Sequence, residues 1–130
     1  GTAFLVVATP ERDAMREAAY FVERLAADRM PLAGLVVNRV HRSPVPALSA
    51  ARSTAAAEEL EARGEHPLTA AALRLHADRM HLAAREQREQ EHFRSAHPTV
   101  PICQVPAMSE DVHDLAGLRE IGELLAARRA

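Results

Sequence analysis

The residues best placed to do chemistry follow three short apolar segments, at residues 9–12, 38–41 and 106–111. If those segments are parallel neighbouring strands, their carboxyl ends meet at one edge of a sheet, where ligands of α/β proteins bind. Asn38 is the informative residue, because its amide offers one donor and one acceptor that match the edge of adenine. The alternative is that Asn38 serves as a turn or cap residue, and the spacing leaves both open.

Several kinds of chemistry are excluded by residue type. The chain contains no Gly-x-x-x-x-Gly-Lys loop and no lysine at all, so it cannot build a phosphate cradle of the Walker type. No Gly-x-Ser-x-Gly elbow is present either. His76 and His81 are five residues apart, roughly 140° around a helix, unlike a zinc-binding pair. We therefore expect no catalytic residue and no metal site, and we interpret the lone Cys103 as a small buried hydrophobe.

Composition sets the class of protein. With 130 residues the chain has the length of one domain, and a net charge of −2 argues against a nucleic-acid partner. No apolar run approaches the roughly 20 residues of a membrane span, and no leader sequence is recognisable. The expected compartment is the cytoplasm.

The strands and helices that position these residues are predicted from apolar runs, capping residues and helical spacing. Residues 3–8 form a uniformly apolar run, which predicts a strand covered on both faces. Thr9 and Pro10 predict the N-cap and first position of a helix. The apolar stripe of that helix is predicted to face the sheet, and it comprises Ala14, Ala18, Phe21 and Leu25.

A second strand is predicted at 32–37, and after Pro44 and Pro46 an alanine-rich helix at 47–63 with Gly64 as its C-cap. A long helix is predicted at 67–94, with Leu68, Leu75 and Leu82 packed and its polar second half, 85–92, solvated. A third strand at 100–105 and a helix from about residue 111 complete the order. The fold class is α/β, a partial doubly wound parallel sheet of three strands with a two-helix insertion between the second and third.

These segments resemble the C-terminal portion of the arsenite-pump and tail-anchored-protein-targeting ATPases, a dimeric branch of the P-loop NTPases. The resemblance is carried by residues 4–12 (FLVVATPER), 31–40 (PLAGLVVNRV), 100–106 (VPICQVP) and 111–115 (DVHDL). These segments are spread across the whole chain, 1–130, and the resemblance rests on their order and spacing. The family's Walker A loop, switch regions and paired zinc-binding cysteines have no counterpart here.

The resemblance implies that the chain is the adenine-side part of an anion-transporting or protein-targeting ATPase, a cytoplasmic hydrolase that uses ATP with Mg²⁺. The cofactor-binding residues would be Asn38, Arg39, Pro106, Ala107 and Met108, and residues 47–96 would form a helical regulatory or client-binding subdomain. The implied partners are an N-terminal P-loop portion of the parent chain, a second copy in a homodimer, and a membrane-protein client or transporter.

Three further expectations stand beside this one. A non-enzymatic interaction module would use the sheet edge and the helical insertion to bind a protein. A small homodimeric α/β protein would bind another nucleotide-like ligand at the same strand ends. Because three strands leave two open edges, self-association by sheet pairing or by exchange of the helical excursion is expected in each case. A start at Gly1 rather than Met, directly inside the predicted strand, leads us to expect an excised domain.

Overall fold

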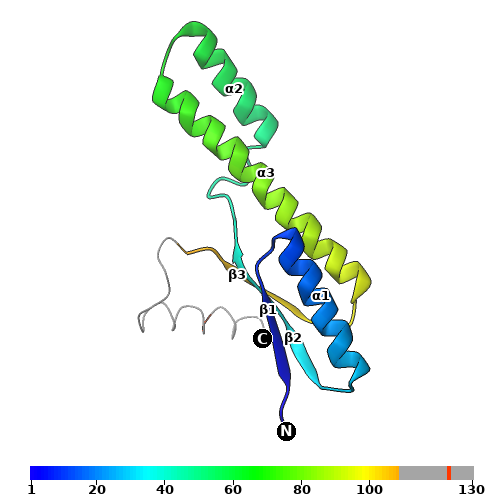
Figure 1. The fold of residues 1–130 in the computed structure, drawn as a ribbon. Helices are drawn as coiled ribbons and strands as arrows, with labels where there is room; N and C mark the ends of the chain where they lie inside the picture. Colours follow the sequence, from blue (N-terminus) through cyan, green and yellow to red (C-terminus); the bar gives the residue numbers. More distant parts are fainter. Residues whose placement is uncertain (109–122, 124–130) are drawn as a thin grey trace. The chain divides into compact units, whose positions relative to one another are not determined.

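The structure is a computed structural model that describes residues 1–108 and residue 123. Within the described residues, three strands and three helices follow one another (Figure 1). They are β1 (Phe4–Ala8), α1 (Arg12–Ala27), β2 (Leu32–Val40), α2 (Ala50–Arg63), α3 (Pro67–Ala96) and β3 (Ile102–Pro106). The helix expected from about residue 111 lies outside the described residues.

The chain divides into two compact units. One contains the described residues of 1–40 and those from 86 onward, and the other contains residues 41–85. The first unit holds the sheet, α1 and the last turns of α3, whereas the second holds α2 and the first turns of α3. None of the described helices is long and apolar enough to cross a membrane.

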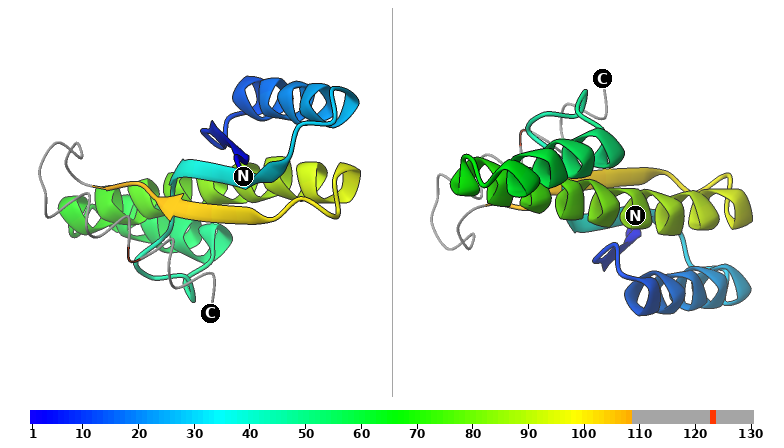
Figure 2. Two further views of the ribbon diagram at one scale, coloured as in Figure 1. Left: turned by 90° about the horizontal axis from the view of Figure 1, so that it is seen from below. Right: turned by 90° about the horizontal axis from the view of Figure 1, so that it is seen from above.

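The three strands form one open parallel sheet in the order β1-β2-β3. Leu35 lies between Val6 of β1 and Ile102 of β3 in the register. Figure 2 shows β2 and β3 side by side. The predicted α/β class is therefore confirmed, with a parallel three-stranded sheet and two helices inserted between its second and third strands.

The core of the sheet-containing unit lies on one face of β2. Its buried residues come from α1, β2 and the last turns of α3, and they are Met15, Ala18, Val22, Leu35, Val37, Val40 and Phe93. Since Phe93 joins the same cluster as the α1 residues, α1 and the end of α3 cover the same face of the sheet. Val6, Ala8 and Ile102 pack against this cluster from the neighbouring strands.

The predicted apolar stripe of α1 is confirmed at Ala18 and wrong at Phe21. Met15, Ala18 and Val22 form the buried stripe, whereas Phe21, which was expected to face the sheet, is 48% exposed. The start of the helix also differs, because Glu11 is the N-cap and makes no side-chain cap hydrogen bond. Thr9 and Pro10 therefore precede the helix rather than begin it.

Strand β1 is not covered on both faces, contrary to its uniformly apolar sequence. Leu5 is 55% exposed and Val7 is 61% exposed, whereas Val6 and Ala8 pack toward the core. The alternation is that of a strand with one buried face. Among the described strands β1 pairs on one side only, with β2. Cys103 on β3 is only partly buried.

Helix α3 differs from the prediction at two leucines that are exposed and at two polar residues that are buried. Leu68 is 86% exposed and Leu75 is 62% exposed. In the polar half, Glu86 and Gln90 are 4% and 0% exposed, on the same side of the helix as Phe93. The expected burial of Leu68 and Leu75 is therefore wrong, and the expected solvation of residues 85–92 is wrong at Glu86 and Gln90.

Helix α2 begins later than predicted and ends where predicted. Ser49 is its N-cap, and the Ser49 side chain accepts a hydrogen bond from the Arg52 N–H at 3.2 Å. Gly64 is the C-cap with φ of 67°, a left-handed conformation that glycine adopts without strain. The Ser53 hydroxyl donates to the Leu73 carbonyl at 2.6 Å, which joins α2 to α3.

Candidate functional site

The carboxyl ends of β2 and β3 are held together by backbone pairing. Val40 lies opposite Pro106 in the register, and the Ala107 N–H donates a hydrogen bond to the Val40 carbonyl at 2.9 Å. Asn38 and Arg39, just before Val40, therefore lie beside the segment that leaves β3. Ala8, the last residue of β1, lies opposite Val37 and brings the third strand end to the same edge.

The backbone of β2 is irregular at this edge. Three steps on β2, from Val37 to Val40, correspond to two steps on β3, from Gln104 to Pro106. The extra residue forms a bulge, a feature that turns side chains away from the regular pleat and is over-represented beside active sites. Arg39 has φ of 58°, a left-handed conformation that costs a non-glycine residue about 1–2 kcal/mol.

Asn38 supports this bulge directly. Its Oδ1 accepts a hydrogen bond from the Arg39 N–H at 2.9 Å, so the turn-type role considered for this side chain is present in the structure. A carbonyl oxygen has a second lone pair, and the Nδ2 group supplies two donors. The half-buried Asn38 thus keeps hydrogen-bonding capacity for a ligand while it holds the local backbone.

The segment opposite the bulge is apolar. Pro106 and Met108 are half-buried, Ala107 between them is exposed, and the Arg39 side chain is exposed on the other strand. The five residues that the resemblance implied for nucleotide binding are therefore gathered at the ends of β2 and β3.

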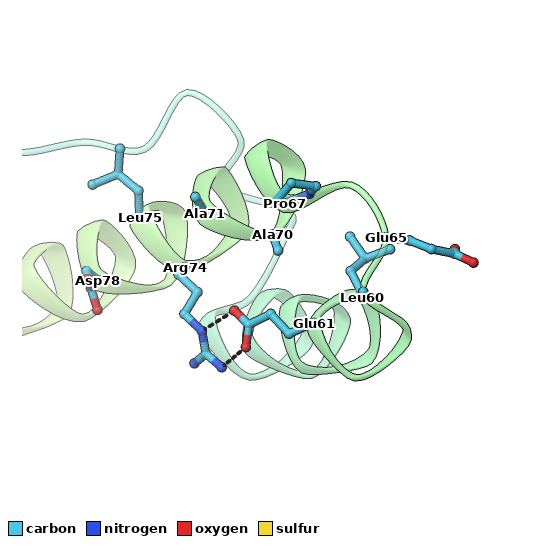
Figure 3. A pocket seen from close by; sticks show the side chains of 10 residues that line it. Leu60, Glu61, Glu65, Pro67, Ala70, Ala71, Arg74, Leu75 and Asp78 are labelled. Carbon is cyan, nitrogen blue, oxygen red and sulfur yellow. Dashed lines mark hydrogen bonds and ion pairs between the residues drawn. The ribbon is translucent and has the colours of Figure 1, made fainter.

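A second concave feature lies within the unit of residues 41–85. A hollow of about 640 Å³ opens between α2 and α3 (Figure 3). Leu60, Ala70 and Leu75 are among the residues that line it. No sequence motif indicates this hollow, because a hollow between two alanine-rich helices depends on how the helices cross.

One ion pair spans this hollow. The Nε and Nη2 atoms of Arg74 each donate to a different carboxylate oxygen of Glu61, both at 2.9 Å (Figure 3). These hydrogen bonds, together with the nearby positive charge, hold the pKa of Glu61 below its ordinary value. A lowered carboxyl pKa stabilises the folded state above the unfolded pKa, and this contribution is lost as the pH falls through the folded pKa.

We expect Arg74→Gln to return the pKa of Glu61 toward its ordinary value, measured by NMR titration of the side-chain carboxyl group. Arg63→Gln is the matched control, because Arg63 pairs with Glu59 rather than with Glu61. A Glu61 titration curve that is the same in wild type and Arg74→Gln would contradict the bidentate contact.

One histidine of this unit, His76, has a structural role. The Nε2 atom of His76 lies 2.7 Å from the Leu48 carbonyl oxygen, and its Nδ1 atom lies 3.4 Å from the Ser43 hydroxyl. His76 thus fastens the segment before α2 to α3. Within residues 1–108, together with residue 123, no three His, Cys, Asp or Glu side chains gather as a metal site would require.

Comparison with known proteins adds no relative. No protein-family model matches the chain, and no curated protein matches it with significant similarity. The resemblance to the arsenite-pump and tail-anchored-protein-targeting ATPases accordingly stays a prediction from the four sequence segments.

Proposed function

We propose that this chain forms the adenine-binding side of an ATP-dependent ATPase of the anion-transporting or protein-targeting kind. The observation that carries the proposal is the bulge at Asn38 and Arg39, paired through Val40 with the segment that begins at Pro106. It supports the proposal because Asn38, Arg39 and the apolar segment from Pro106 belong to the carboxyl edge of a parallel sheet, where nucleotides bind in α/β proteins.

The proposed recognition uses ordinary base chemistry. The Asn38 amide would donate from Nδ2 to a ring nitrogen of adenine, and the second lone pair of Oδ1 would accept from the exocyclic amine. Pro106 and Met108 would cover one face of the ring, and the exposed Arg39 guanidinium would stack on it or approach the sugar and phosphates. The left-handed Arg39, with φ of 58°, donates its N–H to Asn38 Oδ1, which ties the amide to the local backbone.

Hydrolysis is assigned to the parent protein rather than to this chain. The chain has no lysine and no phosphate-binding loop, so the triphosphate and its Mg²⁺ would be held by an N-terminal P-loop portion. In this proposal the parent acts as a homodimer with a membrane-protein client or a transporter as its partner. The chain by itself would contribute selectivity for the base.

The test is nucleotide binding by the full-length parent with Asn38→Ala and Asn38→Asp. We expect ATP affinity to fall about tenfold in both variants, because each removes the amide donor. The preference for ATP over GTP is expected to fall with it. Asn38→Asp keeps an oxygen that accepts from the Arg39 N–H, so its melting temperature should match wild type. Calorimetry with ATP and GTP measures the effect.

The paired variants separate base recognition from support of the bulge. Wild-type ATP affinity in Asn38→Asp would refute the proposed contact to adenine. A parent protein that binds no nucleotide at all would refute the ATPase assignment as a whole.

The exposed face of β1 favours a second candidate function, a non-enzymatic interaction module. Leu5 and Val7 are more than half exposed, and β1 has one unpaired side among the described strands. Such a strand can add to the sheet of a partner protein. A P-loop in the parent protein favours the ATPase, whereas a parent that lacks one and binds no nucleotide favours the module.

A further inference from the structure

The hollow between α2 and α3 has an aliphatic floor. Its uncharged lining residues are small or aliphatic, and they are Leu60, Gly64, Pro67, Ala70, Ala71 and Leu75. None of the described residues that line it is aromatic. Its volume of about 640 Å³ falls in the range of roughly 300–1,000 Å³ that small-molecule sites occupy. The lining therefore suits the methylene groups of an aliphatic small molecule.

The charged residues of this lining are mostly acidic. Glu61, Glu65 and Asp78 supply three carboxylates against the one guanidinium of Arg74, which gives the lining a net charge of −2. Arg74 pairs with Glu61 through its two hydrogen bonds. Glu65 and Asp78 are exposed, and neither has a hydrogen-bond or ion-pair partner among the described residues. The hollow therefore keeps two carboxylates available to a cation.

The pKa of Arg74 shows how acidic these surroundings are. It is raised above its ordinary value, first by the hydrogen bonds with Glu61 and then by the negative charges of Glu61, Glu58 and Asp78. One guanidinium thus lies among more carboxylates than it can neutralise. Charge complementarity accordingly selects a cation, rather than an anion or a neutral molecule, as the occupant.

The two unpaired carboxylates lie toward opposite ends of the hollow (Figure 3). Glu65 precedes Pro67, the first residue of α3, whereas Asp78 follows Pro67 by eleven residues. Eleven residues rise about 16 Å along a helix axis. Ala71 and Leu75 lie between the two ends, on α3. A ligand that pairs with both carboxylates must therefore separate two positive charges by a length of apolar chain.

We propose that this hollow binds a linear aliphatic polyamine. One terminal ammonium group pairs with Glu65 and the other with Asp78, and the methylene chain lies over Ala71 and Leu75. Hydrogen bonds from an ammonium group to a carboxylate are charge-assisted, and the methylene groups lose contact with water. A quaternary ammonium ligand fits less well, because such ligands are recognised by aromatic cages. The proposal does not depend on nucleotide binding, since none of these residues belongs to the edge formed by β2 and β3.

The first test is calorimetry on the full chain, without nucleotide, using diaminobutane and diaminododecane, each with its amines at the two chain ends. The two probes carry the same charge and differ in length. We expect diaminododecane to bind about tenfold more tightly or better, because only the longer chain reaches both carboxylates and covers the floor. Equal affinities, or no binding of either diamine, would overturn the proposal. Binding of an oligolysine peptide without binding of diaminododecane would indicate a protein partner and overturn it as well.

The second test places a cation on the floor of the hollow. Ala71→Arg is expected to weaken diaminododecane binding about tenfold or more, because like charges then meet in the site. Ala72→Arg is the matched control, since Ala72 is an exposed neighbour on α3 that does not belong to the lining. It should leave the affinity within about twofold of wild type. Equal losses in the two variants would show a general charge effect and overturn the proposal. Circular dichroism confirms that both variants keep their helices.

The third test removes the two carboxylates one at a time. Glu65→Gln and Asp78→Asn should each weaken diaminododecane binding about two- to fivefold, the effect of losing one exposed ion pair. Glu17→Gln removes an exposed carboxylate from α1, in the other compact unit, and should leave the affinity unchanged. Wild-type affinity in both Glu65→Gln and Asp78→Asn would place the diamine elsewhere on the protein and overturn the proposal.

Discussion

Replacing Gly34 by alanine is expected to lower the free energy of unfolding by about 1–3 kcal/mol, the usual range for overpacking a tight contact. A Cβ atom at Gly34 would lie 2.8 Å from the Pro101 carbonyl oxygen, closer than side-chain carbons approach. The same oxygen accepts the Leu35 N–H at 2.8 Å, so the backbone cannot move apart without stretching that hydrogen bond. Urea unfolding followed by circular dichroism measures the loss.

Ala33→Val provides the control for Gly34→Ala. Ala33 is the preceding residue of β2 and is exposed, so the added methyl groups meet solvent rather than backbone. Its stability should stay within about 0.5 kcal/mol of wild type. Equal urea midpoints for Gly34→Ala and wild type would mean that residue 101 does not approach β2 as closely as described.

Replacing Gln90 by methionine is expected to stabilise the protein, raising the free energy of unfolding by about 1–3 kcal/mol. The Gln90 side chain is 0% exposed, and neither its Oε1 nor its Nε2 atom has a hydrogen-bond partner among the described residues. Methionine has a similar length and shape without the amide, so the substitution removes two unpaired polar atoms and leaves no cavity. The measurement is again urea unfolding.

Gln87→Met is the matched control, because it makes the same change on the exposed side of the same helix. We expect no change in the urea midpoint of that variant. A midpoint for Gln90→Met at or below the wild-type value would contradict the prediction. It would show that the buried Gln90 amide is hydrogen-bonded in solution.

Much of the fold could be predicted from the sequence because glycine and proline residues mark where its elements begin and end. Gly64 and Pro67 separate two helices, and an uninterrupted run produces the 30-residue α3. Apolar runs of strand length gave the three strands within one to three residues of their ends. Their parallel order then predicted that the ends of β2 and β3 would lie together, as they do.

The burial of α3 could not be predicted, since periodicity shows which residues share a face but not what covers that face. Leu68 and Leu75 share a face that α2 leaves exposed. Glu86 and Gln90 are polar by type, yet they lie on the side of Phe93 and are buried with it. The same limit explains α1, where adjacent apolar residues such as Phe21 and Val22 left the phase ambiguous.

The bulge at the candidate site gave no signal in the sequence. A left-handed residue inside a strand usually suggests glycine, but the residue here is Arg39. Asn38 was identified from its place at the end of a strand, and its bond to the Arg39 N–H depends on backbone angles that residue types do not specify. The residues of the site could be named in advance, but their local geometry could not.

Strand β1 has a consequence for how the protein behaves in concentrated solution. Its five residues, Phe4–Ala8, contain no charge and no proline, and Leu5 and Val7 stand exposed beside an edge that is unpaired among the described strands. Natural sheets usually protect such edges with lysine, proline or a bulge, because bare strands stack into cross-β fibrils. Long storage at high concentration therefore favours amyloid growth seeded from this segment, and a single charged residue in place of Val7 would act as a gatekeeper against it.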